Sequence, residues 1–425
     1  MEETKQKPAG AKPAGISRRA VLQLAAAAGV AQLVPPLMIE ARGEQPVKLG
    51  MDNPLTGTYA ETGKNELIGC QLAVEQINAK GGILGRQAVL LSEDSTSGDA
   101  GTSVQKARKL IDRDKVNFLL GNVNSALSVA MAEVSFQKGV LHVVPGGHTD
   151  QVTGKTCHWN VFRVCNTTRM LTNAIAKSLM QMYGKKMYFL TSDYAFGHTL
   201  QEGYDANLKE DGGVDLGVDM IPLGTTDFSS YLIKAQAANP NVIVFLMNGN
   251  DLTNALKQAV QFGLDKRFHL AGANQELETL EALPPEARLG DWVFEWYWNQ
   301  PKVPHVMEFV DAIKKKTGRV PTSRTWFGFV GGWTCALAAN NAKSLDPVKM
   351  AKALQGYTLP PEVGLMPNAP FYRAGQNQLI GSLYVGTAQP KGSVPDDLFH
   401  VTRIVDGKTI AGTVEESGCK MTWPT

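Results

Sequence analysis

Residues 55–94 read LTGTYAETGKNELIGCQLAVEQINAKGGILGRQAVLLSED, and the pattern of this stretch decides the fold class. An apolar run at 47–52 suits a buried strand, and a loop rich in Gly and Thr follows it. Apolar side chains then recur at the spacing of one helix face: Leu67, Cys70, Val74 and Ile77. A turn at 78–82 ends that helix, and a second strand starts at 88–91. The stretch therefore predicts a strand–loop–helix–strand unit.

The same alternation continues along the chain. Further apolar, β-rich runs are found at 116–120, 140–144, 187–191, 242–247 and 268–270. Helical stripes lie between them, for example at 171–182 and 252–260. Continuous apolar strands that alternate with helices predict an α/β fold with parallel sheets covered on both faces. In such sheets ligands bind outside the carboxyl ends of the strands, so the loops that follow the strands are the candidate site.

Two of these loops have the composition of an anion cradle. Asn124 or Ser125 is a good N-cap for the helix that follows, and a helix N-terminus presents free backbone N–H groups. Gly146, in the loop 145–149, allows close approach of the backbone to a ligand. These features favour a carboxylate ligand, although Ser125 could simply cap its helix and Gly146 could simply turn the chain.

The elements of residues 55–94, in their order and spacing, resemble the branched-chain amino-acid binding protein family, and the resemblance extends from about residue 47 to the mid-380s. These proteins are the periplasmic substrate-binding subunits of ABC importers. The resemblance implies a type I periplasmic binding protein fold with two lobes, a cleft between them and three interlobe crossings. It implies an N-terminal lobe of 46–164 plus 297–364 and a C-terminal lobe of 165–296 plus 365–425. The crossings would lie near 162–166, 294–298 and 364–371.

The resemblance also assigns roles to single residues. In this family a serine of the first loop, together with backbone and hydroxyl groups of the second, holds the ligand α-carboxylate. Ser125, Gly146 and His148 match these positions, with His148 in place of the usual hydroxyl residue. Tyr59 and Phe196 match positions that contact the ligand. The full set of candidate ligand-binding residues is Tyr59, Thr62, Asn124, Ser125, Gly146, His148, Phe196, Asn248, Gly272 and Trp326.

The family's ammonium site is not matched. The acidic residue expected after the strand ending at Leu270 is missing from the segment 271–275, which contains Gly272, and a frequent family tyrosine falls on Asn248. A buried ammonium without a carboxylate partner is costly. An aromatic or aliphatic carboxylate, or an amide-like solute, therefore fits better than leucine, isoleucine or valine. Four aromatic residues at period two, at 292–298, favour core or interlobe packing over a ligand site.

We expect a solute-binding subunit that captures a small carboxylate-bearing solute by hinge closure and docks on an inner-membrane ABC permease with its ATPase subunits. A sensor protein of the same fold, or a binder of amides or urea, in which Asn248 and Asn274 would matter more, stays open as an alternative. The sequence has no GxSxG, Walker or GxGxxG motif in the required context and no metal-ligand spacing, so we expect neither an enzyme nor a cofactor.

Residues 1–45 form a different segment. A twin-arginine pair, Arg18-Arg19, precedes a short apolar run that ends at 35–36, which predicts an export signal and a periplasmic protein. This segment carries six basic and four acidic side chains, which accounts for the whole net charge of +2. The rest of the chain is near neutral, which argues against nucleic acid and membrane surfaces as partners. No later segment is long and apolar enough for stable membrane insertion.

Five cysteines are present. Cys70 and Cys335 lie in apolar helical patterns and are expected to be core thiols. Cys157 and Cys165 flank a short segment and could pair. Residues beyond 391 are expected to form a small strand pair, to which we assign no function.

Overall fold

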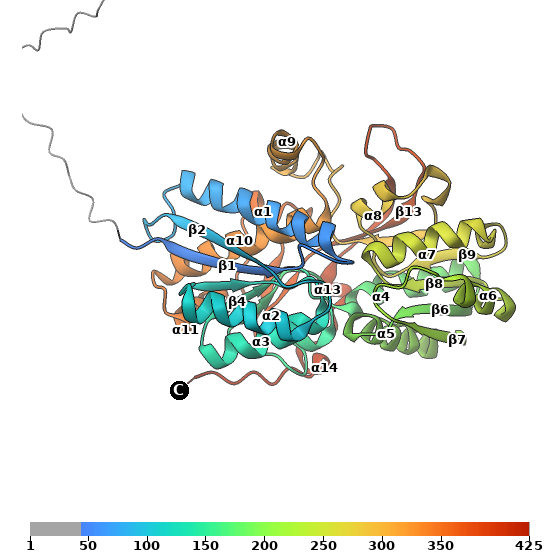
Figure 1. Ribbon diagram of the computed structural model, residues 1–425, viewed down its shortest axis with the longest axis horizontal. Helices are drawn as coiled ribbons and strands as arrows, with labels where there is room; N and C mark the ends of the chain where they lie inside the picture. The colour runs from blue at the N-terminus through green and yellow to red at the C-terminus, as the bar shows by residue number, and fades with distance from the viewer. Residues whose placement is uncertain (1–43, 425) are drawn as a thin grey trace, which may run out of the picture. The chain divides into compact units, whose positions relative to one another are not determined.

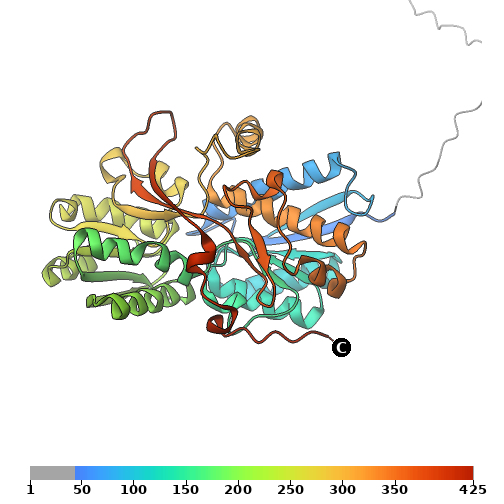
Figure 2. The same ribbon diagram turned by 180° about the vertical axis from the view of Figure 1, so that it is seen from behind.

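The computed structural model describes residues 44–424, which form two seven-stranded sheets with helices on both faces (Figures 1 and 2). Both sheets are mixed and mostly parallel, as the alternating pattern predicted. The expected signal segment lies outside the described residues. Within residues 44–424, no helix has both the length and the apolar character needed to cross a membrane.

The first sheet has the strand order β11-β12-β5-β4-β3-β1-β2. Its strands are β1 (Val47–Asn53), β2 (Ala88–Asp94), β3 (Phe118–Leu120), β4 (Leu141–Val144), β5 (Val161–Arg163), β11 (Phe371–Arg373) and β12 (Gln378–Ile380). All neighbours pair in parallel except β11 and β12, which form an antiparallel hairpin. We call this sheet with its helices the first lobe.

The second sheet has the order β14-β13-β10-β9-β8-β6-β7. Its strands are β6 (Lys186–Ser192), β7 (Val214–Ile221), β8 (Val242–Leu246), β9 (His269–Gly272), β10 (Asp291–Phe294), β13 (Leu383–Ala388) and β14 (Phe399–Val405). The strands from β7 to β10 are parallel, and β13 and β14 add antiparallel to that edge. We call this sheet with its helices the second lobe.

Helices connect and cover these strands (Figure 1). In the first lobe they are α1 (Ala60–Ala79), α2 (Ala100–Arg108), α3 (Ser125–Lys138), α9 (Val306–Thr317), α10 (Ser323–Ala342), α11 (Pro347–Leu354) and α12 (Pro361–Gly364). The second lobe has α4 (Thr168–Tyr183), α5 (Ala195–Asp211), α6 (Ser229–Ala238), α7 (Gly249–Gln261) and α8 (Leu277–Ala282), and α13 (Gly407–Ile410) and α14 (Val414–Ser417) follow β14. Short helical turns occupy Lys109–Arg113, Asp150–Thr153, Leu264–Lys266 and Pro285–Ala287.

Close contact between α1 and α10 positions the first lobe's half of the site. A Cβ placed on Gly69 of α1 would lie 1.8 Å from the carbonyl oxygen of Thr325, and one on Gly328 of α10 would lie 1.8 Å from the carbonyl oxygen of Glu66. The two helix backbones touch at these glycines, because no side chain separates them. The predicted stripe of α1 is on the inside, since Cys70, Val74 and Ile77 are buried.

The third expected crossing between the lobes was wrong in position. The resemblance implies that residues 371–380 belong to the C-terminal lobe, but β11 and β12 complete the first sheet beside β5. Tyr372 of this hairpin packs its ring edge-on to Phe162 and shares a hydrogen bond of 2.8 Å with Thr334, which holds the hairpin on the first lobe. The chain passes to the second sheet only between Ile380 and Leu383.

The suggested pairing of Cys157 with Cys165 was also wrong. Cys157 forms a disulfide with Cys419, and Cys165 is a buried free thiol. Cys157 lies in the loop before β5 of the first lobe, whereas Cys419 lies beyond β14 of the second lobe. The C-terminal segment therefore returns to the first lobe, where Trp423 also packs on Trp159 at 6.0 Å between ring centroids. Beyond residue 391 a single strand, β14, pairs with β13 in place of the expected strand pair.

Candidate functional site

A small cavity lies where loops at the carboxyl ends of strands from both sheets meet. Its lining comes from both lobes: Tyr59, Val123, Ser125, His148, Tyr194, Phe196, Asn248 and Arg324. The cavity leaves about 10 Å³ for the centre of a water molecule, which is room for roughly one water. The side chains of the two lobes therefore nearly fill the space between these loops.

Five of the ten candidate residues are brought together in this lining: Tyr59, Ser125, His148, Phe196 and Asn248. They follow five different strands, β1, β3 and β4 of the first lobe and β6 and β8 of the second. The rule that parallel strands present their carboxyl ends to a ligand placed these loops on one side of each sheet. That these residues bind a ligand stays a prediction.

Three other candidates have structural partners and do not line the cavity. Thr62 donates from Oγ1 to the carbonyl oxygen of Tyr59 at 2.7 Å, inside the first turn of α1. Asn124 caps α3, with Oδ1 accepting from two backbone N–H groups at 2.9 and 3.3 Å. Trp326 donates from Nε1 to the carbonyl oxygen of Gly364 at 3.1 Å. These contacts make them supports of the loops and helices around the cavity.

The two candidate glycines also lie behind the lining. A Cβ on Gly146 would lie 2.1 Å from Oε1 of Glu66 and 2.3 Å from Nη1 of Arg324, so this glycine makes room for a buried ion pair. A Cβ on Gly272 would lie 2.3 Å from the ring of Trp292, so this glycine makes room for an aromatic core residue. Trp292 and its aromatic neighbours at 294, 296 and 298 are buried away from the cavity, which confirms the packing interpretation.

Polar contacts join the two lobes beside the cavity. The hydroxyl groups of Tyr59 and Tyr194 lie 2.5 Å apart, and their ring centroids lie 6.4 Å apart. Asn65 of α1 donates from Nδ2 to Oε1 of Glu278 in α8 at 3.3 Å. These contacts link elements of different sheets, and they depend on the lobes being close together.

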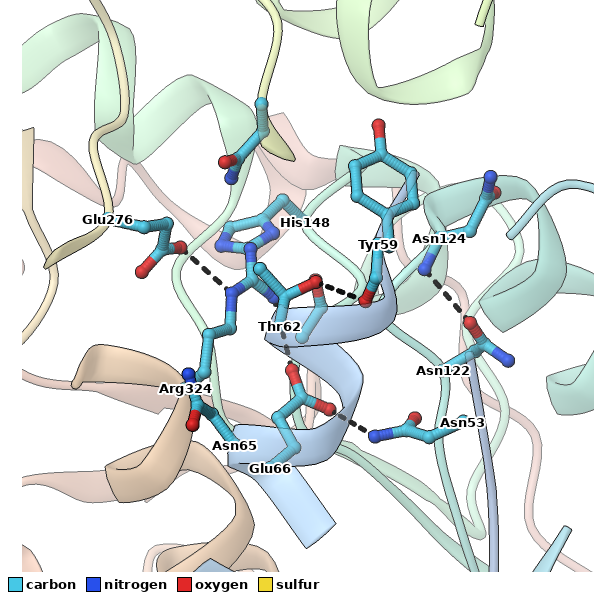
Figure 3. Close-up of polar contacts among 12 residues, drawn as sticks. Asn53, Tyr59, Thr62, Asn65, Glu66, Asn122, Asn124, His148, Glu276 and Arg324 are labelled. Carbon is cyan, nitrogen blue, oxygen red and sulfur yellow. Dashed lines mark hydrogen bonds and ion pairs between the residues drawn. The ribbon is translucent and has the colours of Figure 1, made fainter. Parts of the chain in front are cut away.

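Arg324 is the main cation of the site, and the sequence reasoning did not identify it. Its Nε donates to Oε1 of Glu276 at 2.8 Å, and its Nη1 donates to Oε1 of Glu66 at 3.1 Å (Figure 3). Glu66 belongs to α1 of the first lobe, and Glu276 follows β9 of the second, so one guanidinium links both lobes. All three side chains are buried. Within residues 44–424 Nη2 has no hydrogen-bond partner, and Arg324 lines the cavity.

A second buried polar group holds His148. Its Nε2 contacts Oε1 of Glu295, the residue just after β10. The other oxygen of Glu295 accepts from the backbone N–H of Asn166 at 2.6 Å and from its Nδ2 at 2.9 Å. Burial opposes ionisation of Glu295, but the charge of His148 and these hydrogen bonds outweigh it and lower the pKa of this carboxyl. The imidazole is thus fixed at the cavity wall by an ionised carboxylate.

Three other buried carboxyls beside the cavity, those of Glu66, Glu276 and Glu278, have raised pKa values. Burial raises the pKa of Glu66 to about 7, although Arg324 and Asn53 act in the opposite direction. Burial also raises the pKa of Glu276, and burial with the charge of Glu276 raises the pKa of Glu278 to about 8. More carboxyl groups than cations are buried here, so some of them are protonated near neutral pH.

The residues that the sequence reasoning missed share one kind of signal. Arg324 is the single charged residue in the segment 323–342, which is otherwise apolar or small. Glu66 likewise interrupts the apolar face of its helix, and Glu295 stands within the aromatic run at 292–298. A charge at a position that the pattern buries requires a partner. That requirement would have indicated the cluster, although not which residues pair.

Glu276 does not replace the acidic residue that is missing from the expected ammonium site. The segment 271–275 contributes no acid to the cavity lining, as the sequence indicated. Glu276 is close by, but its Oε1 is committed to Arg324 and it does not line the cavity. Within residues 44–424, no group of three or more His, Cys, Asp or Glu side chains could hold a metal ion.

A larger cavity, of about 200 Å³, lies between α4, α5 and the C-terminal segment. Several of its charged side chains are already paired within the protein. Arg169 contacts Glu416 at 3.3 Å, and Asp150 accepts from the first turn of α4 at 3.0 Å. The smaller cavity is the better candidate, because it lies at the carboxyl ends of the strands and has free polar groups.

Comparison with known proteins agrees with this architecture. Residues 46–393 match the family described as periplasmic binding protein, and the chain therefore belongs to this family, whose members bind solutes and are not enzymes. Leu/Ile/Val-binding protein homolog 7 of Brucella suis is 28% identical over 72% of this chain and 80% of its own length.

Two solved structures extend the comparison. An amino-acid ABC transporter substrate-binding protein of Pseudomonas fluorescens is 27% identical, covers 89% of this chain and 100% of its own, and superposes with a TM-score of 0.79. A solute-binding protein of R. palustris, in complex with benzoate, is 19% identical, with 88% and 100% coverage and a TM-score of 0.78, which shows a common fold.

Proposed function

We propose that this protein is the extracytoplasmic solute-binding subunit of an ABC importer and that it captures a small carboxylate-bearing solute between its lobes. One observation carries the proposal: the cavity is lined from both lobes and has a buried guanidinium on its wall. A solute held there would contact both lobes at once, which is what closure around a ligand requires.

The first lobe supplies the groups for the carboxylate. Ser125 accepts from the backbone N–H of Thr149 at 3.1 Å through Oγ, so its hydroxyl hydrogen is free to donate to a ligand. Arg324 has a free Nη2 on the same wall, and His148 is held there by Glu295. A charge-assisted hydrogen bond contributes about 1.5–3 kcal/mol. Two or three of them, less the costs of ordering, support micromolar affinity, about −8 kcal/mol.

Closure of the lobes would complete the site. The contacts Tyr59–Tyr194 and Arg324–Glu276 are made between the lobes and would be lost on opening. A ligand that binds the closed form better shifts the population toward it. The closed form would then dock on an inner-membrane permease with its ATPase subunits; the ABC-transporter relatives support these partners.

We also propose export through the twin-arginine pathway. The motif Arg18-Arg19 supports that route, and the Cys157–Cys419 disulfide supports residence in an oxidising compartment. Replacing both arginines by lysine keeps the charge and should leave the protein in the cytoplasm, which cell fractionation measures. Export of the lysine variant at the normal rate would contradict this route.

A thermal-shift screen tests the ligand class. The panel holds benzoate-type acids, short aliphatic acids, leucine, isoleucine, valine, urea and small amides. A ligand at a hundred times its Kd adds about 2.7 kcal/mol of stability. Carboxylates should stabilise the protein, and Ser125→Ala should abolish the shift, whereas Ser178→Ala, outside the cavity, should keep it. A response restricted to leucine, isoleucine and valine, or to urea and amides, would contradict the proposed ligand class.

A further inference from the structure

Asn248 presents a fixed hydrogen-bond donor to the cavity from the second lobe. It caps α7, and its Oδ1 accepts from the backbone N–H of Gly249 at 2.6 Å. Because that partner is a donor, the oxygen of the amide must face it, and Nδ2 points the other way. Within residues 44–424 Nδ2 has no hydrogen-bond partner, although Asn248 is only 3% exposed and lines the cavity.

The free polar groups of the cavity side chains are donors on both sides. The first lobe offers the hydroxyl hydrogen of Ser125 and Nη2 of Arg324, and the second lobe offers Nδ2 of Asn248. The hydroxyl pair of Tyr59 and Tyr194 shares one hydrogen, so it keeps one more to donate. A ligand that supplies oxygen atoms would pair with these donors.

The lining offers no matching place for a cation. Of the residues in 44–424 that line the cavity, none is Asp or Glu. Glu276 does not line the cavity: its Oε1 is paired with Arg324, and its Oε2 is buried without a hydrogen-bond partner in residues 44–424. Glu295 is paired with His148 and Asn166. A ligand ammonium would therefore face Arg324 and Asn248 as donors, which repel it or leave it unpaired.

Resting on the proposed function, we infer that Asn248 determines specificity, and that the ligand is a carboxylic acid with a second oxygen function and no ammonium group. Arg324 and Ser125 hold the carboxylate from the first lobe, and Nδ2 of Asn248 donates to the second oxygen from the other lobe. A keto acid, a hydroxy acid or a hydroxylated aromatic acid has this chemistry. The second oxygen then links ligand recognition to closure.

Two matched sets of acids test this inference by isothermal titration calorimetry. The first set is leucine, 4-methyl-2-oxopentanoate and 4-methylpentanoate, which share a carbon skeleton and carry an ammonium, an oxygen or neither. The second set is 4-aminomethylbenzoate, 4-hydroxybenzoate and benzoate. In at least one set the oxygen-bearing acid should bind roughly tenfold or more tightly than both partners. Tightest binding by an ammonium-bearing member would overturn the inference.

The variant Asn248→Asp isolates the donor. Aspartate caps a helix as well as asparagine, so Oδ1 can still accept from Gly249 while the Nδ2 donor is replaced by an acceptor. The affinity for the oxygen-bearing acid should fall roughly tenfold or more, while that for the oxygen-free acid should change less. Asn250→Asp is the matched control, because it adds the same charge two residues along α7 at an exposed position.

The possible results distinguish a failure of this inference from a failure of the proposed function. If acids bind but Asn248→Asp weakens all members of a set as Asn250→Asp does, Asn248 is not a specificity residue, and the proposed function stands. If the unaltered protein binds leucine more tightly than 4-methyl-2-oxopentanoate, the site selects ammonium and the inference is wrong. If no acid of either set binds the unaltered protein, the proposed carboxylate ligand fails, and the inference fails with it.

Discussion

A buried arginine between two carboxylates is the central feature of the site at the scale of single residues. Arg324 pairs with Glu66 and Glu276, and each of the three is nearly inaccessible to solvent. Such a group is stable as a set, because each charge offsets the cost of burying the others. Removing one member leaves an uncompensated charge in a medium that solvates it poorly.

Replacing Arg324 by methionine should therefore cost about 3–5 kcal/mol of unfolding free energy. Urea denaturation followed by circular dichroism measures the change. The control is Arg319→Met, because Arg319 pairs with Glu281 with its own side chain 52% exposed, and such pairs contribute about 0–1 kcal/mol. Equal losses in the two variants would show that the buried pairing is not what stabilises Arg324.

The raised pKa of Glu278 predicts that stability depends on pH. In the folded protein its pKa is about 8, against an ordinary value of 4.5, so between these values the folded state holds a proton that the unfolded state has lost. Stability then falls as the pH rises through this window, by up to about 1.4 kcal/mol per pH unit for one proton. Glu295 has a lowered pKa and acts at lower pH in the opposite direction.

Glu278→Gln should flatten this dependence, because glutamine keeps the acceptor for Asn65 and cannot ionise. Thermal unfolding midpoints at several pH values from about 5 to 8 measure the pH dependence of stability in both proteins. The exposed Glu286→Gln should leave the slope unchanged. If the slope of the unaltered protein is zero or positive across this range, the burial of Glu278 does not control it.

Single residues also mark what the sequence could and could not predict about the site. Loops after strands were predictable, because apolar runs locate strand ends, and Ser125, His148 and Asn248 follow such ends. The pairing of Arg324 with Glu276 was not predictable, because the two residues are 48 positions apart and meet only when the lobes are close. Asn124 was predicted as a ligand residue or a cap, and it is a cap.

At the scale of elements, the pair α1–α10 places Glu66 and Arg324 side by side. Gly69 and Gly328 allow the two backbones to touch, with a Cβ at either position 1.8 Å from a carbonyl oxygen of the other helix. Neither helix can accept a larger residue there without moving apart. The geometry of the buried ion pair thus depends on two residues that carry no functional group.

Two substitutions on α10 should have opposite effects. Gly328→Ala pushes the new methyl group into the backbone of α1 and should destabilise by about 1–3 kcal/mol or more. At Gly331 of the same helix the nearest atom to a new Cβ is 3.5 Å away, so Gly331→Ala should be neutral or stabilise by up to about 1 kcal/mol. Urea denaturation measures the unfolding free energy of both variants. Similar gains in both variants would mean that helix propensity, not helix contact, dominates.

Most elements of the fold were predictable, and the exceptions share a cause. The parallel strands appear as continuous apolar runs because both faces are covered, so β6 and β8 were placed within one residue. The hairpin β11–β12 has three-residue strands with mixed composition, and its place depends on Tyr372 packing against Phe162. Local pattern carries no information on that long-range contact, so the third crossing was misplaced.

At the scale of the whole described chain, the lobes are linked by the backbone at three places and by a disulfide at a fourth. The C-terminal segment leaves β14 of the second lobe and is fixed to the first lobe through Cys157–Cys419. Other contacts support it, since Arg373 of the first lobe donates to the carbonyl oxygen of Gly412 at 2.7 Å. The disulfide closes a chain segment of 262 residues, so it restricts the unfolded state strongly.

Replacing both Cys157 and Cys419 by serine should lower the unfolding free energy by about 2–5 kcal/mol. It should also make the segment after residue 410 more sensitive to limited proteolysis, because the noncovalent contacts alone must hold it. Added reductant should produce the same loss in the unaltered protein and none in the double variant. Thiol titration in denaturant should find three free thiols of the five cysteines in the unaltered protein. Five free thiols, or a stability that reductant does not change, would mean that the disulfide does not hold the C-terminal segment.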